Sequence, residues 1–139
     1  RQSRTYGPTL LRSDTKALSQ FLRKGVARED IVLKSEGNQF FSYNYVADTV
    51  SGILWCLLYG DCGEAYNVSD PGSNITLKEL AQLIAEQSGT KVVFELPDEV
   101  ERQGYSTATV AVMDSAKLRQ MIPSVTGLIS SLITLSRIR

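Results

Sequence analysis

Short apolar runs alternate with amphipathic helical patterns along the 139-residue chain. The strand-like runs are DIVLK (30–34), EAYNVS (64–69), KVVFEL (91–96) and TVAVM (109–113). Helical patterns separate them, and the connections are short. Strands that alternate with helices in this way build a sheet with helices packed on it. The sequence therefore predicts a single domain of the α/β class.

The helical patterns carry signals at both ends. A capping residue pairs with a closing glycine in three of them: Ser13 or Asp14 with Gly25, Asp48 or Thr49 with Gly60, and Thr76 with Gly89. Thr76 and Glu79 match a capping box. A helical turn is expected from Asp114 to Met121, and apolar residues return at helical spacing after Thr126. The apolar stripes, including Val50, Ile53, Leu54, Leu57 and Leu58, are interpreted as core.

Aromatic residues crowd the segment SEGNQFFSYNYVAD (35–48). A strand from Phe41 to Val46 would place Phe41, Tyr43 and Tyr45 on one face. Two interpretations follow. The aromatic row is either core or the wall of a ligand site.

Composition excludes several classes of function. Fifteen basic and fifteen acidic residues give no net charge, and no basic run favours nucleic acid or a membrane surface. Histidine is absent, and Cys56 and Cys62 cannot form a zinc site alone, so no metal is expected. Cys56 lies in an apolar helical pattern and is interpreted as a small buried hydrophobe. These features favour a cytoplasmic protein with reduced thiols.

No self-contained catalytic motif occurs in the chain. The sequence lacks a glycine-rich dinucleotide loop, a Tyr-x-x-x-Lys pair and a nucleophile elbow. Composition and spacing alone therefore indicate an α/β domain and no specific chemistry.

Four segments resemble the extended short-chain dehydrogenases that act as NAD-dependent sugar-nucleotide epimerases and dehydratases. RQSRTYGP (1–8) resembles the Arg-x-x-Asn-x-Tyr-Gly-Pro segment ending their sixth strand, and EGNQFFSYNYVAD (36–48) their Gly-x-x-x-Arg-Ser-Phe-x-Tyr-Val-x-Asp segment. GEAYNVSDPGSNITLKELAQLIAEQSG (63–89) is similar to their Tyr-Asn-(Val/Ile)-Gly strand and the next helix, and DSAKLRQM (114–121) to their Asp-x-x-Lys-Leu segment. The four occur in family order.

The resemblance implies that residues 1–139 form the C-terminal, substrate-binding lobe together with the last strands of a Rossmann-type parallel sheet. The family's cofactor loop and Tyr-x-x-x-Lys pair would lie upstream of Arg1, so the N-terminal cofactor-binding domain would be absent. The intact enzyme would use NAD, which this chain alone would not bind, and no catalytic residue would lie in it. Exposed sheet edges and a bare apolar face would favour self-association.

The implied activity belongs to the intact enzyme. A nucleotide-diphosphate sugar is oxidised to a keto-sugar by hydride transfer to NAD. The keto-sugar then epimerises, dehydrates or decarboxylates, as in isomerases and lyases of carbohydrate biosynthesis. The rival hypothesis is a non-catalytic binding or interaction module that kept the fold.

Seven residues correspond to site positions of the family. Gln2 and Ser3 would lie beside the nicotinamide. The others would contact the sugar nucleotide: Arg4 at the position of an asparagine, Tyr6, Leu33 in the strand near the base, Phe41 at the position of a phosphate-binding arginine, and Arg102 as the second arginine.

Alternatives stay open at three of these positions and at one neighbour. A ring at Phe41 can stack on a base or sugar, but it cannot bind phosphate as a guanidinium does. Arg102 is either a phosphate ligand or a solvated loop residue, and Tyr6 either contacts substrate or packs under the Gly-Pro turn. Asp48 is interpreted as a helix N-cap in preference to a ligand.

Overall fold

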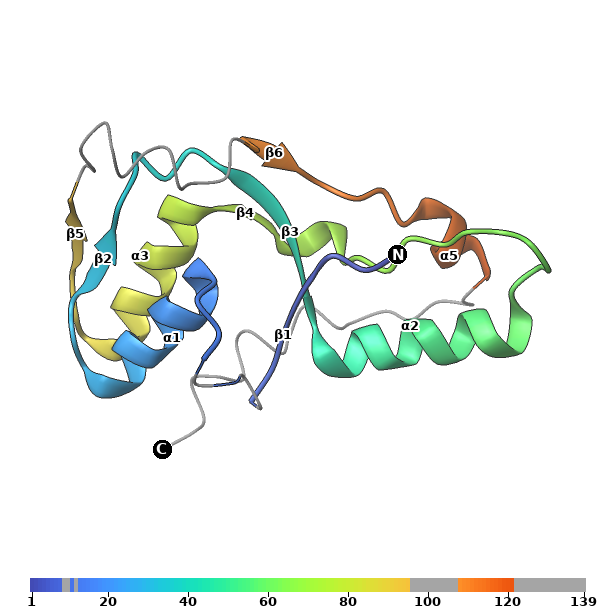
Figure 1. Ribbon diagram of the computed structural model, residues 1–139, viewed down its shortest axis with the longest axis horizontal. Helices are drawn as coiled ribbons and strands as arrows, with labels where there is room; N and C mark the ends of the chain where they lie inside the picture. Colours follow the sequence, from blue (N-terminus) through green and yellow to red (C-terminus); the bar gives the residue numbers. More distant parts are fainter. Residues whose placement is uncertain (9–10, 12, 96–107, 122–139) are drawn as a thin grey trace. The chain divides into compact units, whose positions relative to one another are not determined.

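The computed structural model describes residues 1–8, 11, 13–95 and 108–121. It contains two compact units. Unit 1 comprises Arg1–Pro8, Ser42–Asn74 and Val112–Arg139, and unit 2 comprises Thr9–Phe41 and Ile75–Ala111. The elements are β1 (Arg4–Tyr6), α1 (Ala17–Ala27), β2 (Ile31–Leu33), β3 (Phe40–Tyr45), α2 (Val46–Tyr59), a short 3₁₀ helix (Pro71–Ser73), β4 (Asn74–Thr76), α3 (Leu77–Ser88), β5 (Val92–Phe94), β6 (Val110–Ala111) and α5 (Ala116–Met121) (Figure 1).

The strand pairings confirm the α/β class. β1 pairs with β3, β2 with β5 and β3 with β6, and each pair is parallel. Parallel strands need crossover connections, which the intervening helices provide. β3 has residues in both units, and β4 adjoins it in the sheet order.

In unit 2, helices α1 and α3 pack together and contact β2 (Figure 1). Gly25 is buried inside α1, and a Cβ atom there would lie 2.8 Å from Ile84 Cγ2 of α3. The expectation that Gly25 ends the helix is therefore wrong. Its missing side chain lets the two helices approach closely, and α1 ends at Ala27 with Arg28 in the left-handed conformation.

The predicted capping box at the start of α3 is confirmed. The Thr76 hydroxyl accepts the Glu79 backbone N–H at 3.1 Å, and the Glu79 carboxylate accepts the Thr76 backbone N–H at 2.9 Å. Gly89 closes the helix in the left-handed conformation with φ of 69°, as predicted. Hydrogen bonds from Thr76 lower the pKa of Glu79.

We expect Thr76→Ala to lower the free energy of unfolding by about 1 kcal/mol, because the Glu79 backbone N–H loses its acceptor and the Glu79 carboxylate loses the Thr76 hydroxyl donor. The lowered pKa means that the folded state favours ionised Glu79. The contribution of Glu79 is therefore present above its unfolded pKa and is lost as pH falls through its folded pKa. Urea unfolding of both proteins at pH 7 and pH 3 measures this. A difference between them that persists unchanged at pH 3 would contradict the role of Glu79.

In unit 1, β1 pairs with the end of β3, and α2 follows β3 without a connection. One face of α2 packs on a cluster of Tyr66, Val68 and Leu118, which Trp55, Cys56 and Met121 border. Gly52 is buried here, and a Cβ atom at Gly52 would lie 2.6 Å from Val68 Cγ1. Cys56 borders this cluster and is partly buried.

The junction of β3 and α2 differs from the expectation. The strand ends at Tyr45 and the helix begins at Val46, so Val46 is not a strand residue. Tyr45 is the N-cap, without a side-chain cap, and Asp48 lies in the first turn. The prediction that Asp48 or Thr49 caps α2 is wrong, because the helix begins at Val46, before both residues. Thr49 is buried within the helix. Its hydroxyl donates to the Tyr45 carbonyl at 3.2 Å and accepts a hydrogen bond from the Asn44 amide at 2.8 Å.

Two further elements differ from their predicted bounds. α1 has Lys16 as its N-cap, while the Asp14 carboxylate accepts the Lys16 backbone N–H at 2.9 Å. The predicted strand over residues 64–69 is reduced to one parallel bridge between Gln2 and Val68. The tail after Thr126 lies outside the described residues.

The interpretation of every apolar helix stripe as core is wrong for α2. Val50, Ile53, Leu54, Leu57 and Leu58 are half to three-quarters exposed, although their spacing is that of a buried face. None of the helices in the described ranges is long and apolar enough to span a bilayer.

Candidate functional site

The chain begins with a segment that pairs with two others in unit 1. Gln2 forms a parallel bridge with Val68, in which the Ser3 N–H donates to the Val68 carbonyl at 3.1 Å. The Val68 N–H donates to the Arg1 carbonyl at 2.7 Å. Further along the same segment, Arg4 and Tyr6 of β1 lie opposite Tyr43 and Tyr45 of β3. The structure thus places Gln2, Ser3, Arg4 and Tyr6 on one continuous extended segment.

Two buried hydroxyl groups beside the bridge have no hydrogen-bond partner among the described residues. They are Ser3 Oγ and Ser69 Oγ, and the bridge between Gln2 and Val68 puts their backbones at neighbouring positions. A buried hydroxyl without a partner is costly, so such groups often mark a site that a ligand or another chain completes. Gln2 is exposed, so its amide is accessible next to them.

Tyr6 is buried, with 9% of its surface exposed, and its ring centroid lies 5.6 Å from that of Tyr45. Burial raises the pKa of its phenol to about 12, and the negative charges of Asp48 and Asp70 add to this effect. Burial and the charge of Asp70 also raise the pKa of Asp48. Tyr6 therefore keeps its proton at neutral pH and can act as a neutral hydrogen-bond donor. Both interpretations of Tyr6, packing under the Gly-Pro turn and contact with substrate, stay predictions.

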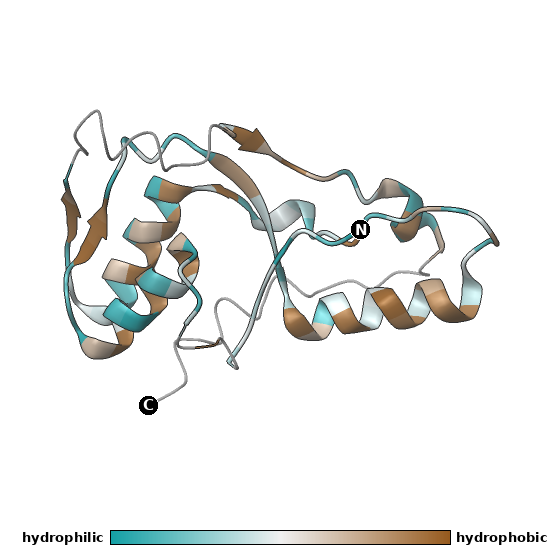
Figure 2. Ribbon diagram, viewed as in Figure 1, coloured by the Kyte–Doolittle hydropathy of each residue, from teal (hydrophilic) through white to brown (hydrophobic). Residues whose placement is uncertain are grey.

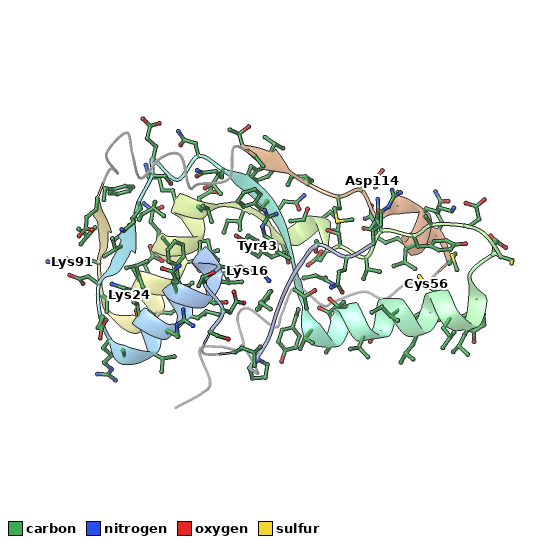
Figure 3. The ribbon with its side chains drawn as sticks, viewed as in Figure 1. Lys16, Lys24, Tyr43, Cys56, Lys91 and Asp114 are labelled. Atoms are coloured by element: carbon green, nitrogen blue, oxygen red, sulfur yellow. The ribbon has the colours of Figure 1, made fainter. Side chains whose placement is uncertain are left out.

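Arg4 is half-buried on β1 and lies opposite Tyr43, which is labelled in Figure 3. Burial raises the pKa of the Tyr43 phenol, and the charge of Arg4 opposes that rise. Tyr43 is 4% exposed, so its ring is core, which is one of the two interpretations of the aromatic row.

Leu33 and Phe41 belong to unit 2. Leu33 is 2% exposed in β2, and its carbonyl accepts the Glu95 N–H at 3.1 Å. Phe41 is 6% exposed in β3 and pairs with Ala111 of β6. Both side chains are therefore core residues within unit 2. Such burial leaves little ring surface on Phe41 for stacking against a ligand.

The remaining predicted residue, Arg102, lies outside the described residues. Four of the predicted residues lie on one segment of unit 1, namely Gln2, Ser3, Arg4 and Tyr6. Leu33 and Phe41 lie in unit 2. Within the described ranges, no group of three or more histidine, cysteine, aspartate or glutamate side chains is placed to hold a metal ion.

Sequence reasoning missed Ser69 and Asp70 as members of the unit 1 site. The Asp70 carboxylate accepts the Gly72 N–H at 2.9 Å and the Ser73 hydroxyl at 2.7 Å. Its effect on Tyr6 depends on the folded arrangement. The signal available was the resemblance of residues 63–89 to a family segment, since Ser69 stands there at the position of a glycine.

Comparison with known proteins gives consistent matches. A model of the NAD dependent epimerase/dehydratase family matches residues 1–69. UDP-glucuronic acid decarboxylase 5 of Arabidopsis thaliana is 30% identical over 127 residues, which cover 86% of this chain and 37% of that protein. UDP-glucuronic acid decarboxylase 6 of the same plant is 33% identical over 82 residues, which cover 59% of this chain and 23% of that protein. The chain spans well under half the length of these relatives.

Solved structures match the fold over nearly the whole chain. UDP-glucose 4-epimerase of Thermotoga maritima, solved with UDP-glucose, has a TM-score of 0.77 at 20% identity and covers 99% of this chain, which corresponds to 43% of that structure. UDP-glucuronic acid 4-epimerase of Bacillus cereus, solved with UDP-glucuronic acid and NAD, has a TM-score of 0.70 at 16% identity over 100% of this chain and 45% of that structure. The chain belongs to the NAD-dependent epimerase/dehydratase family.

Proposed function

We propose that this chain is the nucleotide-sugar-binding part of an NAD-dependent epimerase, dehydratase or decarboxylase. The observation that carries the proposal is the 30% identity to UDP-glucuronic acid decarboxylase 5 over 127 residues. The substrate would be a nucleotide-diphosphate sugar, and UDP-glucuronic acid is the first compound to test. The setting would be carbohydrate biosynthesis in the cytoplasm.

The residues near the start of the chain fit a role beside the cofactor. NAD would accept a hydride from the sugar and, in some family reactions, return it. The buried hydroxyl of Ser3, which has no partner within the described ranges, and the accessible amide of Gln2 can each form a hydrogen bond with a polar edge of the nicotinamide. Their place next to Val68 fixes the backbone that carries them. These two residues would orient the cofactor and transfer no proton.

Substrate contacts would come from Arg4, Tyr6, Leu33, Phe41 and Arg102. Arg4 offers a guanidinium and Tyr6 a neutral phenol, so both can donate hydrogen bonds to the sugar nucleotide. The burial of Leu33 and Phe41 limits their role to the backbone and the shape of the wall. Arg102 would supply the cation for the diphosphate.

We expect the isolated 139-residue chain to bind no measurable NAD and to convert no sugar nucleotide, because it lacks the glycine-rich loop and the Tyr-x-x-x-Lys pair. Isothermal titration calorimetry with NAD tests the first part. NMR of UDP-glucuronic acid, UDP-glucose and dTDP-glucose incubated with NAD and the chain tests the second. Stoichiometric NAD binding would contradict this expectation.

The decisive experiment uses the complete protein that carries this chain. With NAD present, it should convert at least one of the three sugar nucleotides to a product visible by NMR. One observation favours a non-catalytic module, namely a phenylalanine at position 41 where the family motif has an arginine. A complete protein that binds none of the three compounds in calorimetry would overturn the enzyme proposal and support the module.

A further inference from the structure

Thr49 is a buried polar residue in a helix that is largely apolar. Brown residues recur along the length of α2 in Figure 2. Asp48, Thr49 and Ser51 are the polar residues of its first two turns, and of these three only Thr49 is buried, with 3% of its surface exposed. A hydroxyl in such a place is stable only when it forms hydrogen bonds. The partners of Thr49 therefore indicate its role.

The Thr49 hydroxyl contacts residues of both β1 and β3. Its oxygen accepts the Asn44 side-chain amide at 2.8 Å and lies 3.3 Å from the Thr5 hydroxyl oxygen. Asn44 and Thr5 lie opposite each other in the pairing of β3 with β1, and Asn44 is 2% exposed. The Thr5 hydroxyl in turn lies 3.4 Å from the Ser3 carbonyl oxygen. A chain of hydrogen bonds, here called the hydroxyl chain, thus runs from Asn44 through Thr49 and Thr5 to the Ser3 carbonyl.

Every arrangement of the hydroxyl protons joins α2 to β1. Each threonine hydroxyl has one proton to donate. Thr49 accepts from Asn44, so its own proton goes either to Thr5 or to the Tyr45 carbonyl, which lies 3.2 Å away. In the first case the Thr5 proton is left for the Ser3 carbonyl. In the second case the Thr5 proton is left for Thr49, and the bond between the two threonines is kept.

Strand β1 carries residues of the candidate site on the side away from the hydroxyl chain. Thr5 lies between Arg4 and Tyr6, and side chains of neighbouring strand residues point to opposite faces. Because Thr5 contacts Thr49 of α2, Arg4 and Tyr6 lie on the other face of the strand. The hydroxyl chain can therefore hold the strand in place without entering the site.

Other contacts hold the two ends of this segment. Before β1, Gln2 forms its bridge with Val68. After β1, a Cβ atom at Gly7 would lie 2.6 Å from Val46 Cγ1, so the backbone there lies against the first residue of α2. Between these ends, the hydroxyl chain joins the middle of the segment to the buried side of the helix.

We propose that Thr49 is a positioning residue for the ligand-binding segment 2–6 and acts on it through Thr5. This inference rests on the proposed function, because it takes residues of this segment as contacts of NAD and the sugar nucleotide. Thr49 itself would touch neither ligand. Its hydroxyl would fix the backbone at Ser3, and with it the spacing between the nicotinamide and the sugar. Reaction rates depend steeply on such spacing.

Thr49→Val and Thr49→Ser separate the effect of the hydroxyl from that of the methyl group. Valine keeps the shape of threonine without its hydroxyl, whereas serine keeps the hydroxyl without the methyl group. In the complete protein with NAD, Thr49→Val should lower kcat/KM for the sugar nucleotide roughly tenfold, and Thr49→Ser should stay within about twofold of the unsubstituted protein. Kinetics measured well below the melting temperature that do not follow the hydroxyl would assign Thr49 a purely structural role and overturn the proposal.

Thr5→Val tests whether Thr49 acts through Thr5. It keeps the buried bond between Asn44 and Thr49, so it probes the link even if Thr49→Val does not fold. Thr5→Val should also lower kcat/KM roughly tenfold, and the double variant should be no worse than either single variant, because both break one chain. Effects that multiply to about a hundredfold in the double variant would contradict a shared path.

Ser51→Ala is the matched control. Its hydroxyl contacts the carbonyl four residues earlier in α2, as the Thr49 hydroxyl does, but Ser51 is exposed in this chain. Ser51→Ala should leave kcat/KM unchanged. A tenfold fall in this control would assign the effect to the helix and not to its link with β1.

Hydrogen–deuterium exchange of the complete protein tests the link without any substrate. In Thr49→Val, the amides of residues 3–6 should exchange about tenfold faster than in Thr49→Ser, while those of α3 should not change. Unchanged exchange of residues 3–6 would overturn the proposal. A complete protein that converts no sugar nucleotide would instead overturn the proposed function, so the two failures are distinguishable.

Discussion

Arg102→Ala should raise the Michaelis constant for the sugar nucleotide about ten- to a hundredfold in the complete enzyme. A charged hydrogen bond contributes roughly 1.5–3 kcal/mol, and each tenfold change corresponds to about 1.4 kcal/mol. Phe41 occupies the place of the family's other phosphate-binding arginine, so Arg102 would hold the diphosphate with less help. The turnover number should change far less, because the diphosphate is bound alike in the ground and transition states.

Steady-state kinetics with Arg119→Ala as a matched control decide this prediction. Arg119 is exposed in the last turn of α5, so its loss removes the same charge from a surface helix. An unchanged Michaelis constant for Arg102→Ala would favour the solvated-loop interpretation. Phe41→Arg is not a suitable second variant for this test. Phe41 is 6% exposed, so an arginine at this position would bury a charge in unit 2.

The second large effect is expected at Ser42. Its side chain is 1% exposed, and its hydroxyl donates to Asn74 Oδ1 at 2.7 Å while accepting the Met113 N–H at 3.0 Å. Ser42→Ala removes the hydroxyl, so Asn74 Oδ1 loses a donor and the Met113 N–H loses an acceptor. Each loss costs about 1–3 kcal/mol when water cannot replace the bond. Asn74 and Met113 are only half-buried, so water can reach them and we expect a total near the lower end, roughly 2–3 kcal/mol.

Thermal melting should show the Ser42 effect as a decrease of roughly 10 °C. Ser51→Ala is the control, because Ser51 is an exposed residue of α2 whose hydroxyl contacts only the preceding turn, the Ala47 carbonyl at 2.8 Å, among the bonds described. That control should change stability by no more than about 0.5 kcal/mol. A melting temperature for Ser42→Ala equal to that of Ser51→Ala would show that the bonds of Ser42 contribute nothing to stability.

The candidate site could be predicted only in part. Resemblance to family segments pointed to Gln2, Ser3, Arg4 and Tyr6, which share one extended segment in the structure. It also places Ser69 at a glycine position of a family segment, but it does not show that Ser69 lies beside Ser3. The neighbouring position of Ser3 and Ser69 depends on a pairing between residues more than sixty positions apart.

The sequence by itself determined those features that depend on neighbouring residues. The capping box of Thr76 and Glu79 and the glycine end of α3 involve contacts within a few positions, so their residue types specify them. The alternation of strands and helices likewise gave the α/β class.

Tertiary structure decided what depends on distant contacts. Glycine is the residue type expected at a helix end, yet Gly25 lies within α1. The Ile84 side chain of α3 occupies the space that a side chain at position 25 would fill, so only glycine fits there. The apolar residues of α2 have the spacing of a core face, yet they are exposed. A hydrophobic pattern shows which side of a helix is apolar, but it does not show which surface covers that side. Burial is a property of the completed fold, since a side chain loses contact with water only when another surface arrives to cover it.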